Sequence, residues 1–229
     1  MNRLIVALDF PDAGSALSLV DHLEGSTSWF KVGLELYIAE GNALITELQR
    51  RGCAIFLDLK LHDIPNTVAG AVRSAARLGV DMLTVHAAGG PAMLAAAVEA
   101  AENRPTLLAV TVLTSMDRAQ LVATGVQDSP AAQVEKLATM AIASGVEGIV
   151  CSPNEVPNLR RRLGNKPLLV IPGIRPEGAA SGDQRRIATP AAAIASGASY
   201  LVVGRPITGA ADPGAAARAI LAEMQMASV

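Results

Sequence analysis

Short runs of hydrophobic residues recur along the chain, separated by longer amphipathic or alanine-rich segments. Most of the runs lack strict polar and apolar alternation, which is typical of parallel strands buried on both faces. The pattern predicts eight strands, at Leu4–Leu8, Trp29–Val32, Ala54–Leu61, Met82–Val85, Leu107–Leu113, Gly148–Cys151, Leu168–Ile171 and Tyr200–Val203.

The segments between these runs carry the start and stop signals of helices. Glycine follows several of them, and the pairs Thr189-Pro190 and Asp212-Pro213 match an N-cap residue followed by proline in the first turn. The pattern predicts eight helices, at Ala13–Leu23, Glu35–Arg51, Thr67–Leu78, Pro91–Glu102, Ala131–Ser144, Glu155–Leu163, Pro190–Ser196 and Pro213–Met226.

Eight strand–helix pairs in 229 residues predict an α/β protein, a single-domain (β/α)8 TIM barrel over residues 1–229. The alternative is a doubly wound open sheet. Such a sheet usually has a glycine-rich turn after its first strand, whereas this chain has DFPD at 9–12. The polar, glycine-containing segment Arg175–Ala188 is expected to be a mobile loop.

Composition narrows the class of protein further. Hydrophobic residues make up 51% and charged residues 17%, which excludes a disordered chain. The 19 basic and 21 acidic residues nearly balance, so we expect no nucleic-acid or membrane partner. Asp9 interrupts the apolar start too early for a secretory signal, and we therefore expect a cytoplasmic protein.

The third predicted strand runs into the sequence DLKLHDIPNT at 58–67. Because side chains alternate along a strand, Asp58 and Lys60 are expected to share the inward face, with the leucines facing the helices. Buried charges are costly unless paired, so an acid and a base inside a barrel favour a functional site. A structural ion pair, or a strand that ends at Leu57 with exposed charges beyond, would also explain the pattern.

Lys60 lies close in sequence to two carboxylates, Asp58 and Asp63, which favour its ammonium form. A Schiff-base nucleophile needs a neutral amine, so a charged lysine that donates a proton is favoured instead. A divalent metal would share Asp58 with a cation, and the chain has no His, Asp and Glu cluster with tight ligand spacing. We therefore expect no metal site.

The last two predicted strand ends have the character of an anion site. Gly204 allows close backbone approach, Arg205 adds a guanidinium, and Arg175 supplies a second one. In barrels of this kind, the loops after strands seven and eight often hold phosphate. A surface ion pair is the alternative for each arginine.

The strand-end residues belong to segments that resemble the orotidine 5′-phosphate decarboxylase family in its bacterial form. DxKxxD alone is shared with related barrels, but IPNT, Lys31, PGIRP and VGRP make the match specific. The segments span nearly the whole chain, at VALDF 6–10, KVGLELY 31–37, DLKLHDIPNT 58–67, TVHAAGG 84–90, VTVLTSM 110–116, PGIRP 172–176 and VGRPIT 203–208.

The resemblance implies decarboxylation of orotidine 5′-monophosphate to UMP and CO2 in pyrimidine biosynthesis, without a cofactor. Lys31, Asp58, Lys60 and Asp63 would form an alternating charged array, in which Lys60 protonates C6 of the pyrimidine and Asp58 lies beside the substrate carboxylate. The working unit would be a homodimer, with Asp63 and Thr67 reaching the partner's active site.

The resemblance also implies the substrate-binding residues. Asp9 and Lys31 would bind ribose hydroxyls, and Thr114 would lie near the pyrimidine. Gln184 would act through a closing loop, although a surface glutamine is the default interpretation of that position. The phosphate would be held by Arg175, Gln184, Gly204 and Arg205.

Three alternatives remain. The nearest is a metal-dependent decarboxylase or synthase of the same barrel superfamily that acts on a phosphorylated keto-sugar. Lys31, where those relatives carry an acidic group, and the IPNT segment argue against it. The others are a Schiff-base aldolase using Lys60 and a nucleotide-binding barrel without catalysis.

Overall fold

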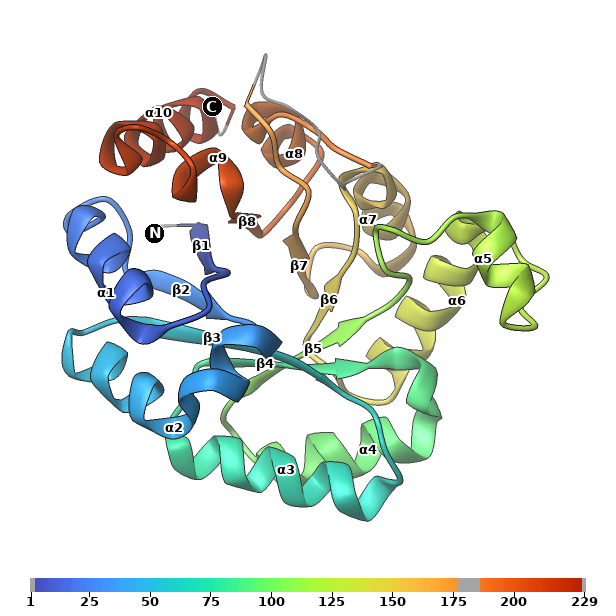
Figure 1. The fold of residues 1–229 in the computed structure, drawn as a ribbon. Helices are drawn as coiled ribbons and strands as arrows, with labels where there is room; N and C mark the ends of the chain where they lie inside the picture. Colours follow the sequence, from blue (N-terminus) through green and yellow to red (C-terminus); the bar gives the residue numbers. More distant parts are fainter. Residues whose placement is uncertain (1–2, 177–185, 228–229) are drawn as a thin grey trace.

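The computed structural model describes residues 3–176 and 186–227. Eight parallel strands close into a barrel in which each strand pairs with the next and β8 pairs with β1 (Figure 1). The predicted (β/α)8 barrel is therefore confirmed. The strands are β1 Leu4–Leu8, β2 Trp29–Val32, β3 Ala54–Leu61, β4 Met82–His86, β5 Thr106–Val110, β6 Gly148–Val150, β7 Leu168–Ile171 and β8 Tyr200–Val203.

Helices surround the barrel on the outside (Figure 1). Within the described ranges, none of them combines the length and apolar character that a membrane span requires. The α-helices are α1 Ala13–His22, α2 Leu34–Arg50, α3 Pro65–Leu78, α4 Gly90–Ala101, α5 Arg118–Ala123, α6 Pro130–Ala143, α7 Val156–Leu163, α8 Pro190–Ala195, α9 Arg205–Thr208 and α10 Pro213–Met226, and the short 3-10 helices are η1 Ala87–Gly89 and η2 Pro153–Glu155.

The structure corrects several of the predicted elements. Strand β5 ends at Val110 rather than at Leu113, and the short helices α5 and α9 were not predicted. Helix α5 starts at a capping box formed by Asp117 and Gln120, and it is too short to show a hydrophobic period. Helix α2 is interrupted at Gly41, whose φ of 59° lies in the left-handed region that glycine tolerates.

The hydrophobic core has two layers. The larger one lies between strands and helices, and the smaller one fills the barrel interior near the strand starts. Gly148 lets three strands meet there, because a Cβ at this position would lie 2.7 Å from Leu108 and 2.8 Å from Leu168. The inner layer consists of Ile5, Ala7, Phe56, Met82, Leu108, Val170 and Val202. Beyond this packed floor, the barrel opens into a cavity toward the carboxyl ends of the strands.

Candidate active site

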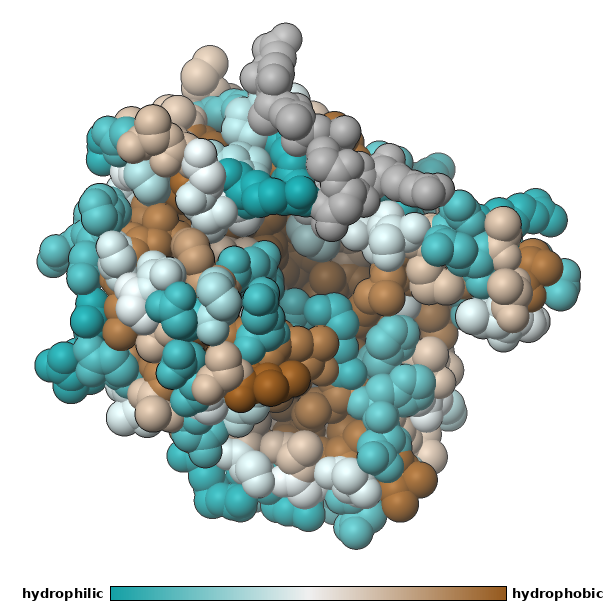
Figure 2. Space-filling view, viewed as in Figure 1, coloured by the Kyte–Doolittle hydropathy of each residue, from teal (hydrophilic) through white to brown (hydrophobic). Residues whose placement is uncertain are grey.

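A cavity of about 510 Å³ opens above that floor, at the carboxyl ends of the strands. Figure 2 shows the hollow at the centre of the face in view. Because side chains alternate along a strand, the residue two positions after an inner-layer residue also points inward. Asp9 lies two positions after Ala7, and Asp58 two positions after Phe56, and both aspartates line the cavity. The predicted site residues in the lining are Asp9, Lys31, Asp58, Lys60, Thr114, Arg175, Gly204 and Arg205.

Four of these residues form a chain of alternating charge across β1, β2 and β3. Lys31 Nζ lies 3.0 Å from Asp9 Oδ1 and 3.7 Å from Asp58 Oδ2. Lys60 Nζ donates to both Asp58 oxygens at 2.9 Å. The side chains of Lys31 and Asp58 are only 12% and 13% exposed, so Asp58 is a largely buried carboxylate between two ammonium groups. We call these four residues the charged array.

The backbone of β3 is irregular where the array is densest. The step from Leu57 to Leu61 covers four residues, whereas the paired step from Leu83 to Val85 on β4 covers two. Lys60 has a φ of 51°, in the left-handed region. The left-handed backbone at Lys60 was not predicted, but Asp58 and Lys60 both line the cavity, as the alternation of side chains predicts. The leucines do pack against the helix-facing core, as predicted.

Two arginines line the part of the cavity that follows β7 and β8, next to Asp9. Arg175 is 7% exposed, and its Nη1 donates to the carbonyl of Ile174 at 2.8 Å. Burial and the positive charge of Arg205 both lower the pKa of the Arg175 guanidinium. Gly204 separates β8 from Arg205, the first residue of α9. Like charges therefore gather here, where the sequence predicts an anion.

The predicted mobile loop is described only at its two stems. Ile174 bridges to Ala188 in parallel register, and the Arg175 amide donates to the Ala188 carbonyl at 2.9 Å. Gln184, predicted to bind phosphate through this loop, lies outside the described residues.

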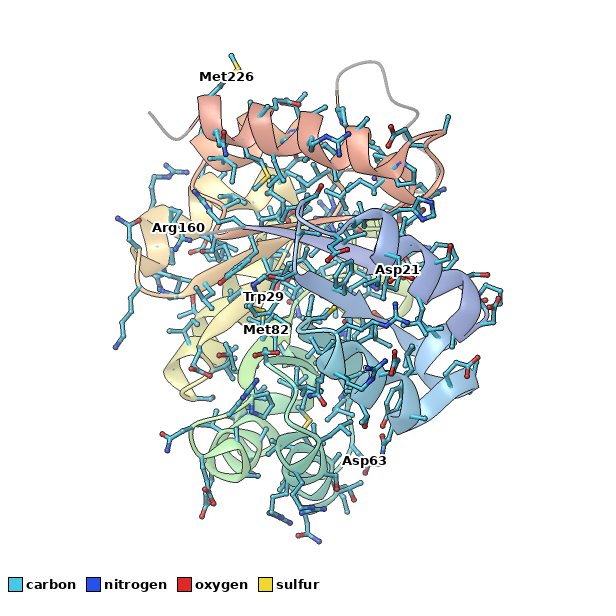
Figure 3. All side chains as sticks on the ribbon, turned by 90° about the vertical axis from the view of Figure 1, so that its left-hand side faces the viewer. Asp21, Trp29, Asp63, Met82, Arg160 and Met226 are labelled. Atoms are coloured by element: carbon cyan, nitrogen blue, oxygen red, sulfur yellow. The ribbon has the colours of Figure 1, made fainter. Side chains whose placement is uncertain are left out.

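Asp63 and Thr67 do not line the cavity of their own chain. Both residues are exposed, and the Asp63 carboxylate accepts a hydrogen bond from the Ile64 amide at 2.6 Å. Figure 3 shows Asp63 near the edge of the molecule, whereas Trp29 and Met82 lie inside the barrel. Within one chain, the structure therefore brings together only three of the four residues predicted to be catalytic.

Two histidines stack beside the array. The rings of His62 and His86 lie 5.3 Å apart, with 20° between their planes. Burial, followed by the charges of His62 and Lys60, lowers the pKa of His86. His86 Nδ1 accepts from the Ala88 amide at 3.3 Å, so the ring caps the turn after β4.

Sequence reasoning missed two features around the cavity. Thr84, on the inward face of β4, donates to Asp58 Oδ1 at 2.9 Å; a lone hydroxyl within an apolar strand was the available signal. Arg186 pairs with the buried carboxylate of Glu155 and donates to the carbonyl of Leu113 at 3.1 Å. Nothing local links residues that lie 31 positions apart, so that ion pair had no sequence signal.

The cavity has the parts of an active site for an anionic substrate. A lysine beside a carboxylate can stabilise developing negative charge and supply a proton, while guanidinium groups bind an oxyanion. Across residues 3–176 and 186–227, no three or more His, Cys, Asp and Glu side chains are grouped to hold a metal ion.

The fold and this cavity define a barrel enzyme whose site lies at the carboxyl ends of the strands. The family model described as the Orotidine 5′-phosphate decarboxylase / HUMPS family matches residues 2–220. The chain belongs to this family, whose decarboxylase members are carboxy-lyases.

Individual relatives support the same assignment. An orotidine 5′-phosphate decarboxylase of Halorhodospira halophila is 55% identical over 228 residues, which cover 98% of this chain and 97% of the relative. The enzyme of that name from Anaeromyxobacter sp. (strain K) is 54% identical over 220 residues, covering 96% and 97%. The crystal structure of the Lactobacillus acidophilus orotidine 5′-phosphate decarboxylase aligns with a TM-score of 0.87 at 40% identity, covering 98% of this chain and 99% of that one.

Proposed function

We propose that this chain converts orotidine 5′-monophosphate to UMP and CO2 in pyrimidine biosynthesis, without a metal or an organic cofactor. The observation that carries the proposal is the largely buried Asp58 carboxylate between Lys31 and Lys60, in a cavity that Arg175 and Arg205 also line. The names of relatives that are more than half identical over nearly the whole chain support the same reaction.

The mechanism is electrostatic. The bond between C6 and the carboxylate breaks, CO2 leaves, and the electron pair stays on C6 in the plane of the ring, where the π system cannot delocalise it directly. The Lys60 ammonium stabilises this developing charge and then donates a proton to C6. The amine regains its proton from water. Asp58, 2.9 Å from the same ammonium, holds it in position.

The remaining cavity residues bind the rest of the substrate. Arg175, Arg205 and the Gly204 backbone hold the phosphate, because guanidinium groups form paired, charge-assisted hydrogen bonds with phosphate oxygens. Asp9 and Lys31 bind ribose hydroxyls, and Thr114 contacts the pyrimidine. Gln184 is proposed to join the phosphate site. Binding energy from the phosphate holds the reacting ring against the array.

The working unit is proposed to be a homodimer in which Asp63 and Thr67 complete the partner's array. Large hydrophobic side chains are exposed near these residues and at the start of α2: Ile64 at 67%, Leu34 at 50% and Ile38 at 80%. Figure 2 shows hydrophobic surface over the start of α2, beside the hollow. Exposed apolar surface of this kind favours a protein interface.

The experiment that tests this function is a direct assay of orotidine 5′-monophosphate conversion, followed by absorbance, with and without a strong chelator. We expect release of UMP at the same rate in both. A metal-dependent keto-sugar decarboxylase would instead lose activity in chelator. A nucleotide-binding barrel without catalysis would bind UMP but would release no CO2 from orotidine 5′-monophosphate. Borohydride trapping with substrate present separates out a Schiff-base aldolase, which would be labelled at Lys60.

A further inference from the structure

The hydroxyl of Thr84 forms hydrogen bonds with two members of the charged array, Asp58 and Lys60. Thr84 is the middle residue of β4 and is 0% exposed. Its Oγ1 accepts a hydrogen bond from the backbone amide of Lys60 at 2.8 Å and donates one to Asp58 Oδ1 at 2.9 Å. The single proton and one lone pair of this hydroxyl are therefore both used on the residues that carry the proposed chemistry.

The amide that Thr84 accepts from belongs to the most distorted part of the barrel. Regular pairing between β3 and β4 stops at Leu57 and resumes at Leu61, with two extra residues on β3. Lys60 lies inside this bulge at a φ of 51°, a conformation that is unfavourable for a residue with a Cβ and needs support from its surroundings. The Thr84 side chain occupies the place where a regular ladder would bond backbone to backbone.

Thr84 also donates a hydrogen bond to the Asp58 carboxylate, in addition to the two lysines. Lys60 Nζ lies 2.9 Å from both oxygens, and Lys31 Nζ lies 3.7 Å from Oδ2. Both lysines are long and flexible, whereas a buried threonine on a central strand has a restricted rotamer. The hydroxyl thus fixes the Asp58 side chain from a rigid element. Thr84 does not line the cavity, so it has no direct route to the substrate.

We propose that Thr84 is a positioning residue, which holds the Lys60 backbone in its left-handed conformation and the Asp58 carboxylate in its orientation, so that the Lys60 ammonium is aimed at the reacting carbon. The expected fall in kcat rests on the proposed function. The expected displacement of Asp58 and Lys60 rests on the hydrogen bonds alone. A displacement of about 1 Å in a reacting group can cost roughly 100-fold in rate.

The test compares two substitutions at this position. Thr84→Val keeps the shape but leaves the Lys60 amide and an Asp58 oxygen without the hydroxyl, so kcat should fall roughly 10- to 100-fold, with KM changed by less than about threefold. Thr84→Ser keeps both hydrogen bonds and should restore kcat to within about fivefold of wild type. Equal kcat values for the valine variant and wild type would overturn the inference.

A matched control separates positioning from general destabilisation. Thr111 is 2% exposed, and its hydroxyl bonds to the Val150 carbonyl at 3.3 Å, away from the array. Thr111→Val therefore removes a buried hydroxyl without touching Asp58 or Lys60 and should keep kcat. If both valine variants lose kcat equally, or if Thr84→Val raises KM as much as it lowers kcat, the role is structural and the proposal is wrong.

A crystal structure of Thr84→Val distinguishes this inference from the proposed function. We expect the contact between Lys60 Nζ and Asp58 to lengthen beyond hydrogen-bond distance, whatever reaction the wild type catalyses. An unchanged array geometry would reject the inference even in an active enzyme, whereas an inactive wild type would reject only the proposed function. If the valine variant does not fold, Thr84→Ala is measured in its place against Thr111→Ala.

Discussion

Two parts of the cavity differ in how their charges are arranged. On the side of β1 to β3, Asp9, Lys31, Asp58 and Lys60 alternate in sign and contact one another. On the side of β7 and β8, burial and then the positive charge of Arg205 lower the pKa of the Arg175 guanidinium. The first side is organised before any ligand arrives, whereas the second becomes more favourable when an anion binds.

This difference indicates a division of labour. A preorganised array acts on charge that develops during the reaction, so changes there should lower kcat. A cluster of like charges gains energy from a bound anion, so changes there should raise KM and weaken ligand binding. The proposed dimer adds a third contribution, because Asp63 lies outside its own chain's cavity.

The largest effect is expected at Lys60. Lys60→Ala removes the proposed stabilising charge and proton donor, and turnover should fall by roughly 10⁴-fold or more. The fold should persist because Asp58 keeps Lys31 and Thr84 as partners. Steady-state turnover is the measurement, with circular dichroism to verify folding. Lys136→Ala, at an exposed lysine on α6, is the control. Near-normal turnover in Lys60→Ala would reject its role.

The next effect concerns the proposed dimer. Ile38→Glu places a charge on an 80% exposed side chain at the proposed interface, so the protein should become monomeric and lose roughly 100-fold in activity as the partner's Asp63 is lost. Light scattering and turnover are measured together. Met226→Glu, at an equally exposed residue on α10, should change neither. A fully active Ile38→Glu monomer would contradict the shared site.

The arginine side should respond in binding. Arg205→Ala removes the proposed charge-assisted contact with the phosphate, and KM for orotidine 5′-monophosphate should rise roughly 10- to 100-fold. Substrate titration measures this, with Arg218→Ala on the exposed face of α10 as the control. Unchanged kinetics in Arg205→Ala would remove the phosphate site from this side of the cavity.

The smallest effect is a pH dependence of stability from His86. Its lowered pKa means that the folded chain takes up this proton less readily than the unfolded chain, whose value is near 6.5. Stability is therefore lost as pH falls below that value. His86→Asn keeps an acceptor for the Ala88 amide, and its Tm should fall less than that of wild type between pH 7 and pH 5. Equal falls in Tm for wild type and His86→Asn would show that His86 does not cause the loss of stability at low pH.

The sequence predicted the barrel because each strand and helix carries its own local pattern, and it predicted Lys31, Asp58 and Arg205 because strand ends converge in this fold. Local alternation could not predict the left-handed backbone at Lys60, which depends on a mismatch between two strands. The Thr84 contacts span 24 and 26 positions, and such pairings have no local signal. The roles of Asp63 and Thr67 rested on family resemblance alone.

The division of labour is tested most directly by equilibrium binding of UMP to wild type, Lys60→Ala and Arg205→Ala, measured by titration calorimetry. UMP keeps the phosphate but lacks the carboxylate that reacts. We predict that Lys60→Ala binds UMP within about threefold of wild type, whereas Arg205→Ala binds it at least about 10-fold more weakly. Equal losses of UMP affinity in the two variants, or a loss confined to Lys60→Ala, would contradict the account.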